Sequence, residues 1–256
     1  MAEDRELTVP VAEVFSSIQG EGLLAGFQQV FVRFRGCDLD CPYCDSPDAR
    51  KLSGPCSLEV APGGETEELQ NPLTVGQLAE AVRRLVGAGP AGLQHSIALT
   101  GGEPLLHAEF IVELAAQLRP LNLPIMLETN GQRPADLRKV ISAVDCVAAD
   151  YKLDSTMSRP VDGEARMQFL RLAQHARTFV KMVVTDAVTC DELSRACAEI
   201  ASVDRGVPVF LQPVSPVVEG IKPPSPRDLL ALRACALGYL RDVRVLPQIH
   251  RLLGLR

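Results

Sequence analysis

The chain has 256 residues, of which 46% are hydrophobic, and it carries 26 basic and 32 acidic side chains for a net charge of −6. A chain of this length can build one sizeable hydrophobic core, so we expect a single domain over residues 1–256. The acidic total, without any block of Lys or Arg, argues against a nucleic-acid-binding surface. The eight cysteines are not spaced as in a secreted disulfide framework, which favours a reducing compartment.

The start of the chain, MAEDRELTVP, is charged and has no apolar segment, so we expect no signal peptide. No apolar run approaches the roughly 20 residues that are needed to cross a bilayer. The sequence therefore predicts a cytoplasmic protein that has no membrane partner.

The first part of the chain leads into a repeating pattern. The segment AEVFSSIQGEG predicts an edge strand or lid over about residues 8–28. The apolar run VFVRF at residues 30–34 predicts the first barrel strand. Residues 47–73 are rich in Pro, Gly and acidic side chains, and we interpret them as an insertion, not as a linker between domains.

From there on, apolar runs of strand length alternate with segments of helical periodicity. Thr74 and Gln77 form a capping-box signature at the start of the first helix, LAEAVRRLV. Further strands are expected at residues 96–100, 124–129, 144–153, 179–185, 207–213 and 243–247. Further helices are expected near residues 107–118, 134–143, 163–176, 190–202 and 226–240. Strands separated by helices predict an α/β fold with a parallel sheet, and six main strands suit a partial (β/α)6 TIM-like barrel.

Three cysteines, Cys37, Cys41 and Cys44, form a C-x3-C-x2-C triplet directly after the first barrel strand. Three thiolates on one loop can each bind one iron of a four-iron, four-sulfur (4Fe-4S) cluster, which is normally held by four cysteines. The fourth iron then keeps an open coordination position, as metals with a chemical role do. A structural zinc site is an alternative, but the other cysteines supply no second C-x2-C pair. Cys56, inside the insertion, is an alternative fourth ligand.

Polar motifs follow several of the predicted strands, and a parallel barrel would bring them to one rim. They are the loop RGCDLDCPYCDS, then TGGEP, ETNG, DYK and LQPVSP. The triplet followed by TGGEP resembles the radical S-adenosylmethionine (SAM) superfamily, in which the open iron binds SAM. The resemblance implies the partial barrel of that superfamily and a SAM site formed by Tyr43, Gly102, Glu103, Asp150, Tyr151, Lys152, Gln212, Pro213, Val214 and Ser215. Tyr43 would flank the adenine, and Glu103 would accept hydrogen bonds from the methionyl ammonium group.

Other segments narrow the resemblance to one family within that superfamily. They are SIQGEG at residues 17–22, FVRFRGC at 31–37, CDS at 44–46 and QIHR at 248–251. They resemble the 7-carboxy-7-deazaguanine synthases from about residue 13 to the C-terminus. The resemblance implies a lyase that converts 6-carboxy-5,6,7,8-tetrahydropterin to 7-carboxy-7-deazaguanine with loss of ammonia, on the route to queuosine and other deazapurines. It also implies an electron donor such as flavodoxin or ferredoxin, and a homodimer.

The family's binding residues carry over to positions at both ends of the chain. The substrate-binding set would be Ile18, Gln19, Gly20, Glu21, Arg33, Thr100, Gln248, His250 and Arg256. The fork of Arg33 suits a carboxylate, and the terminal carboxylate of Arg256 is a further candidate ligand. The family binds Mg²⁺ through a hydroxyl after the third cysteine, where this chain has Ser46 in place of the usual Thr. We expect a weaker Mg²⁺ site, because Ser lacks the methyl that restrains the hydroxyl and Mg²⁺ demands tight octahedral geometry.

Two alternatives stay open. The D-x-K pattern at residues 150–152 departs from the Ser-Pro-Lys of some family members and is closer to glycyl-radical activating enzymes. That activity gives no reason for SIQGEG or for the QIH segment. A non-catalytic metal-binding fold is the second alternative. In the preferred interpretation no residue beyond the cofactor ligands needs to be catalytic, since the radical chemistry belongs to the cofactor.

Overall fold

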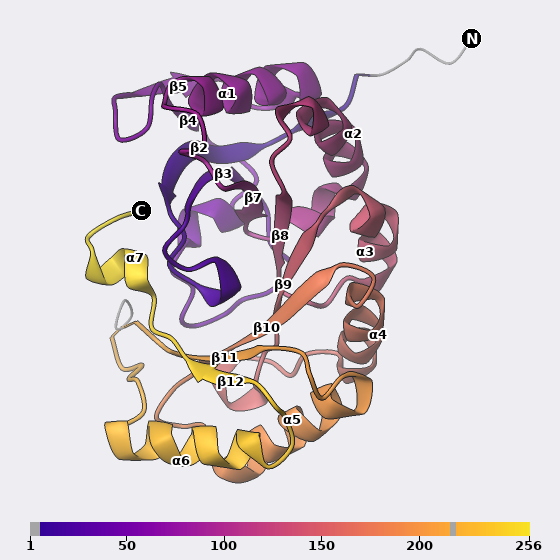
Figure 1. Cartoon of the computed structure of the whole chain (residues 1–256), viewed down its shortest axis with the longest axis vertical. Helices are drawn as coiled ribbons and strands as arrows, with labels where there is room; N and C mark the ends of the chain where they lie inside the picture. Colours follow the sequence, from indigo (N-terminus) through magenta and orange to yellow (C-terminus); the bar gives the residue numbers. More distant parts are fainter. Residues whose placement is uncertain (1–5, 216–218) are drawn as a thin grey trace.

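The computed structural model describes residues 6–215 and 219–256 of the chain (Figure 1). Parallel strands form a curved barrel sheet: β3 (Gln28–Phe34), β7 (Ser96–Gly101), β8 (Ile125–Thr129), β9 (Cys146–Asp150), β10 (Arg177–Val184), β11 (Val209–Pro213) and β12 (Val243–Val245). The helices between them are α1 (Val75–Gly87), α2 (Ala108–Leu118), α3 (Pro134–Val140), α4 (Gly163–Ala173), α5 (Cys190–Val203) and α6 (Pro226–Leu237). Because each helix joins two strands that are neighbours in the sheet, the predicted partial (β/α)6 barrel is confirmed. In Figure 1 the helices form an outer layer around the strands.

Local sequence signals explain where the first helix begins. The Thr74 hydroxyl accepts a hydrogen bond from the N–H of Gln77, and the Gln77 side chain accepts one from the N–H of Thr74. This is the predicted capping box, which satisfies main-chain donors that a helix start leaves free.

The N-terminal segment and the insertion extend the barrel sheet on the side of β3. Their strands in that sheet are β2 (Val11–Ile18), β4 (Cys56–Glu59) and β5 (Thr66–Leu69), whereas β1 (Thr8–Val9) and β6 (Leu73–Thr74) pair antiparallel as a separate two-stranded sheet. β2 pairs antiparallel with β3 and parallel with β4, and β5 lies beyond β4. The predicted edge position of the N-terminal strand is therefore wrong, because the insertion supplies two strands that cover β2. The sequence hides them, since β5 (TEEL) is polar and largely exposed.

Side chains of the barrel strands alternate between the helix-facing side and the barrel interior. Val30, Leu99 and Val180, for example, pack in the core beneath the helices. The lower layer of the interior is apolar and contains Phe31, Ala98, Met126, Ala148, Phe179 and Phe210, which we call the apolar floor. Two residues further along each strand stand Arg33, Thr100, Glu128, Asp150, Lys181 and Gln212, which we call the polar layer. Apolar side chains thus fill the lower layer of the barrel interior, and polar side chains line the layer above it.

The remaining cysteines are used in packing and in one cross-link. Cys190 and Cys235 form a disulfide between α5 and α6, with their Cα atoms 6.0 Å apart. Their separation of 45 residues gave no sign of it, because such pairing depends on tertiary proximity. Among the residues that the structure describes, no helix is long and apolar enough to cross a membrane.

The floor residue Phe179 supports the polar layer from below. It is 2% exposed, meets Phe210 edge-on at 5.5 Å, and lies so close to Gly22 that a Cβ there would be 2.0 Å from its ring. We expect Phe179→Ala to lower the free energy of unfolding by about 3–5 kcal/mol, because it opens a cavity in packed surroundings. Urea denaturation measures the change. Phe27→Ala, at a side chain 49% exposed, is the control and should cost less than about 1 kcal/mol; equal losses would contradict a packed floor.

Candidate active site

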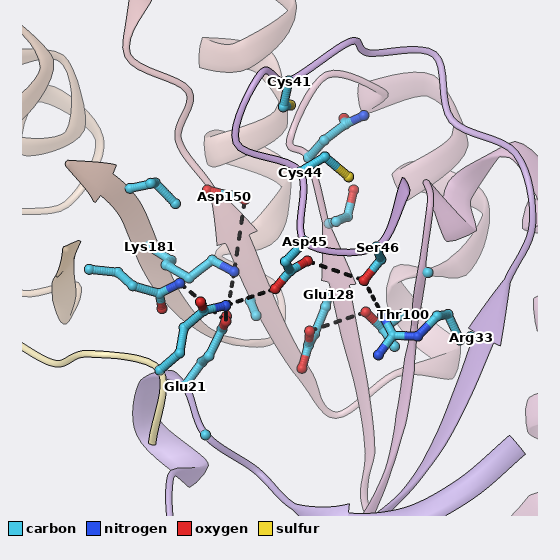
Figure 2. Close-up of a pocket in the computed structure, with 18 of the residues that line it drawn as sticks. Glu21, Arg33, Cys41, Cys44, Asp45, Ser46, Thr100, Glu128, Asp150 and Lys181 are labelled. Atoms are coloured by element: carbon cyan, nitrogen blue, oxygen red, sulfur yellow. Dashed lines mark hydrogen bonds and ion pairs between the residues drawn. The ribbon is translucent and has the colours of Figure 1, made fainter. Parts of the chain in front are cut away.

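A cavity opens above the apolar floor, at the C-terminal ends of the barrel strands (Figure 2). Strand ends, the cysteine loop, the loop after β2 and the segment around the last helix α7 (Ile249–Leu252) all contribute to its wall. From the predicted site residues, the wall contains Ile18, Gln19, Gly20, Glu21, Arg33, Cys37, Cys41, Tyr43, Cys44, Ser46, Thr100, Gly102, Asp150, Lys152, Gln212, Val214, Ser215, Gln248, His250 and Arg256. Pro216, the last residue of the LQPVSP motif, lies outside the described residues.

Three predicted SAM residues do not line this cavity. Tyr151 and Pro213 follow inward-facing residues on their strands, so alternation turns them to the other face. The Tyr151 hydroxyl donates to Glu199 at 2.6 Å, and its ring lies beneath Arg166. The structure therefore places these two side chains outside the wall of the cavity.

Glu103 is the third predicted SAM residue outside the cavity wall, because its carboxylate accepts hydrogen bonds from other groups of the protein. It is fully buried and accepts hydrogen bonds from Leu105 N (3.0 Å), Thr129 Oγ1 (2.8 Å) and Asn130 N (2.7 Å). Burial raises the pKa of Glu103 to about 7 despite these three donors. In this structure the side chain fastens the end of β7 to the end of β8 and does not line the cavity.

The Gly101–Gly102 pair is required by contact with the start of the cysteine loop. A Cβ on Gly101 would lie 2.2 Å from the carbonyl oxygen of Phe34, and one on Gly102 would lie 2.0 Å from that of Gly36. Gly102 N donates to Phe34 O at 3.1 Å, and Glu103 N donates to Gly36 O at 2.7 Å. The end of β7 therefore fixes the position at which the cysteine loop leaves the barrel.

The cysteine loop brings three free thiols to one wall of the cavity. Cys37, Cys41 and Cys44 all line it, and Cys44 N donates to Cys41 O in a tight turn. Burial raises the pKa of the Cys37 thiol to about 11 and also raises that of Cys41, so metal binding would have to supply their deprotonation. Cys56 is buried in β4 and is not among the described wall residues. The three thiols thus fit a 4Fe-4S cluster in which cysteines bind three of the four irons.

A chain of alternating charges crosses the polar layer. Lys181 Nζ lies 2.5 Å from Glu21 Oε2 and 3.8 Å from Asp150, and Lys152 Nζ lies 2.6 Å from Asp150 Oδ2. Burial alone would lower the pKa of Lys181, but the carboxylates of Glu21, Asp150 and Glu128 outweigh it and raise that pKa. Lys181 is therefore a fixed cation and not a base. Figure 2 shows Lys181 between Glu21 and Asp150, below Cys41 and Cys44.

Glu128 presents a second carboxylate to the cavity. Gln19 Nε2 donates to Glu128 Oε1 at 2.7 Å, and Thr100 Oγ1 donates to Oε2 at 3.2 Å. The Gln19 amide also donates to Gln29, and its oxygen accepts from Glu21 N, so Gln19 orients neighbouring groups. Burial, reinforced by the charge of Glu21, raises the pKa of Glu128.

Oxygen and nitrogen donors gather where the cysteine loop meets the end of the chain. Asp45 Oδ1 accepts from Ser46 Oγ at 3.1 Å, and Arg33 Nη1 donates to the same hydroxyl at 3.1 Å. Gln248 Nε2 donates to Asp45 at 2.8 Å and to Glu21 at 2.7 Å. Ligand atoms of Glu21, Asp45 and His250 lie within 4.8 Å of one another, so this corner of the cavity can hold a cation.

An apolar patch adjoins the cysteine loop. Tyr43 packs with Val183 and Val214 from the ends of β10 and β11, and Lys152 Nζ lies 5.3 Å from the centroid of the Tyr43 ring. Within the described residues, Asp150 Oδ1 is buried and has no hydrogen-bond partner. An aromatic face beside an unused acceptor suits the adenine and the hydrogen-bond donors of a nucleoside.

Sequence reasoning missed four charged residues of the wall, Glu128, Lys181, Asp45 and Arg50. Glu128 and Lys181 lie inside runs that are mainly apolar, PIMLET and FVKMVVT. A charge at an inward position of such a strand is the signal that could have identified them. Asp45 stands between two assigned residues, Cys44 and Ser46, and the spacing pattern gave it no role of its own.

Comparisons with known proteins agree with this geometry. Residues 31–189 match the family model of the Radical SAM superfamily. A 7-carboxy-7-deazaguanine synthase from Geobacter sulfurreducens is 42% identical over 245 residues, covering 94% of this chain and 96% of its own. Another from Methanothermobacter thermautotrophicus is 35% identical over 269 residues, covering 98% and 99%. The fold is similar to the crystal structure of QueE from Escherichia coli, with a TM-score of 0.61 at 18% identity and 94% coverage of both chains.

Loss of the buried charge of Lys181 should destabilise the protein. Lys181→Met leaves Glu21 and Asp150 without their shared cation, and we expect the free energy of unfolding to fall by about 3–5 kcal/mol. Lys51→Met is the matched control, because Lys51 pairs with Asp48 where both side chains are exposed (69% and 85%), and its loss should cost no more than about 0.5 kcal/mol. Urea denaturation compares the two. A Lys181 variant as stable as the control would show that the charge chain is not a stabilising element.

Proposed function

This chain belongs to the 7-carboxy-7-deazaguanine synthases of the radical SAM superfamily, and we propose that it converts 6-carboxy-5,6,7,8-tetrahydropterin to 7-carboxy-7-deazaguanine with loss of ammonia. As a radical SAM enzyme it uses a 4Fe-4S cluster and SAM, a small-molecule substrate and a reductant. The observation that carries the proposal is the cavity in which the thiol triplet faces the SIQGEG and QIH residues. A glycyl-radical activating enzyme gives no reason for those residues, and this alternative is not favoured.

Cys37, Cys41 and Cys44 would hold the cluster. When bound, the cluster and SAM supply the 5′-deoxyadenosyl radical that removes a hydrogen atom from the substrate. Tyr43, Val183 and Val214 offer the apolar surface that adenine needs, next to the thiols. The free acceptor of Asp150, with Gly102, Lys152, Gln212 and Ser215 on the same wall, supports a SAM site at this end of the cavity.

The other end of the cavity suits a pterin. The pyrimidine edge of a pterin carries adjacent N–H donors, and Glu21 and Glu128 are carboxylate acceptors held by their neighbours. Phe15 and Phe31, stacked at 5.1 Å, give the wall an apolar face that matches a bicyclic ring. Arg33 would pair with the substrate carboxylate, and His250 closes the site against Gly20.

A Mg²⁺ ion at Ser46 would orient the substrate carboxylate and balance its charge. Support comes from the Asp45 carboxylate beside the Ser46 hydroxyl, because Mg²⁺ prefers oxygen ligands. Although desolvation opposes it, the Gln248 amide and the charges of Arg33 and Lys181 lower the pKa of Asp45, so the carboxylate stays ionised. A donor such as flavodoxin or ferredoxin would supply the electron, and we expect the enzyme to work as a cytoplasmic homodimer.

The chain's own residues then bind, orient and exclude water, and none has to act as a strong acid or base. Lys181 keeps its proton because carboxylates surround it. The apolar floor and the segment around α7 close the cavity on two sides. Exclusion of water protects a radical from side reactions.

The purified protein should form 7-carboxy-7-deazaguanine when it is incubated without oxygen with SAM, dithionite, Mg²⁺ and the carboxy-tetrahydropterin, and no second protein should be needed. Chromatography with mass detection measures the product. Cys41→Ala should abolish it, whereas Cys197→Ala, at a free cysteine buried in α5, should leave product formation within about twofold of wild type. Protein with an intact cluster that cleaves SAM but forms no deazaguanine would overturn the proposed substrate.

A further inference from the structure

The insertion and the end of the chain meet beside the cavity through an ion pair between buried Glu59 and half-exposed Arg256. Glu59 of β4 is 2% exposed, and its carboxylate accepts hydrogen bonds from Ser16 N (2.6 Å) and Gly63 N (2.9 Å). Arg256 supplies the cation, with Nη2 3.4 Å from Glu59 Oε1. A carboxylate buried this deeply is unfavourable without a positive partner, so burial of Glu59 favours the docked position of Arg256.

Further contacts hold Arg256 against β2. Ser17 Oγ donates to the main-chain oxygen of Arg256 at 2.9 Å, so that oxygen is engaged by the protein. Glu13 Oε2 lies 3.7 Å from Arg256 Nη1, and the guanidinium carbon lies 5.1 Å from the centroid of the Phe15 ring. Figure 1 shows the C-terminal segment, in yellow, returning from β12 toward the side of the sheet where β2 and β4 lie. The guanidinium of Arg256 is therefore the part of this residue that can donate hydrogen bonds to an anion in the cavity.

Arg33 stands at the same aromatic ring. Its guanidinium carbon lies 5.7 Å from the Phe15 centroid, and its Nε donates to Glu13 Oε1 at 2.6 Å. Glu13 therefore bridges two guanidinium groups that both line the cavity. A guanidinium carries five N–H donors, and contacts within the described part of the chain use two on each arginine. The remaining donors can bind an anion in the cavity.

We propose that Arg256 and Arg33 together bind the substrate carboxylate, and that Glu59 is a positioning residue that holds the Arg256 guanidinium for this task. The inference rests on the proposed function, which supplies a substrate with one carboxylate. Each arginine uses part of its fork for protein contacts, so two planar forks together are better suited than one to engage both oxygens of the carboxylate. The site would thereby prefer a carboxylated pterin, and the insertion would have a role in substrate selection.

Equilibrium binding tests this assignment independently of turnover. The reconstituted, SAM-bound holoenzyme without reductant is titrated calorimetrically with 6-carboxy-5,6,7,8-tetrahydropterin and, separately, with tetrahydropterin that lacks the carboxylate. Arg256→Ala and Glu59→Gln should each weaken binding of the carboxylated ligand by at least about tenfold, because a charge-assisted contact is lost. Binding of the ligand without the carboxylate should change by less than about twofold in both variants.

Two further variants separate positioning from a general structural effect. Because Glu59 acts through Arg256, the double variant should bind the carboxylated ligand no more weakly than Arg256→Ala alone. Glu67→Gln is the matched control: Glu67 belongs to the same insertion but pairs with Arg84 at the surface, so both dissociation constants should stay at their wild-type values.

The outcomes are distinct. Arg256→Ala that binds the carboxylated ligand as tightly as wild type overturns the inference and leaves the proposed function intact. Additive losses from Glu59→Gln and Arg256→Ala overturn the positioning role. A wild-type protein that binds neither pterin overturns the proposed function together with this inference. Should Glu59→Gln fail to fold, Arg256→Ala alone still decides the carboxylate contact, because its side chain is 47% exposed.

Discussion

Close main-chain packing between the end of β7 and the start of the cysteine loop is the constraint on which the site depends. With a Cβ at Gly102 only 2.0 Å from the oxygen of Gly36, no other residue fits there without displacing the loop. The buried Glu103 then fastens this junction to the end of β8. The position of the three thiols in the wall of the cavity, above the polar layer, is therefore set by this junction.

Charge compensation is the second requirement of the cavity. Each carboxylate in it is held by an amide, a hydroxyl or a cation: Lys181 serves Glu21, and Gln19 and Thr100 serve Glu128. Ionised groups survive burial only when such partners are present. A preorganised set of acceptors and cations can hold a polar bicyclic substrate without reorganising during the reaction. The apolar floor keeps this arrangement rigid from below.

Much of the fold could be predicted because buried parallel strands are continuous apolar runs and helices between them have clear periodicity. The cofactors could be predicted because the cysteine triplet and the glycine pair are short motifs whose residues lie close together in the sequence. Consecutive residues of a motif, however, face opposite sides of a strand, which is why Tyr151 lies outside the cavity wall that Asp150 and Lys152 line. The contact between Glu59 and Arg256 joins residues 197 positions apart, and one sequence contains no pattern that could predict it.

The central requirement for the proposed reaction is a 4Fe-4S cluster that three cysteines hold and whose fourth iron binds SAM. Mössbauer spectroscopy of ⁵⁷Fe-reconstituted protein, prepared without oxygen and recorded before and after SAM is added, tests this directly. We expect one of the four irons to change its isomer shift on addition of SAM while the other three keep theirs, because only that iron lacks a protein thiolate. A spectrum that SAM leaves unchanged, or a protein that retains zinc in place of iron, would contradict the account.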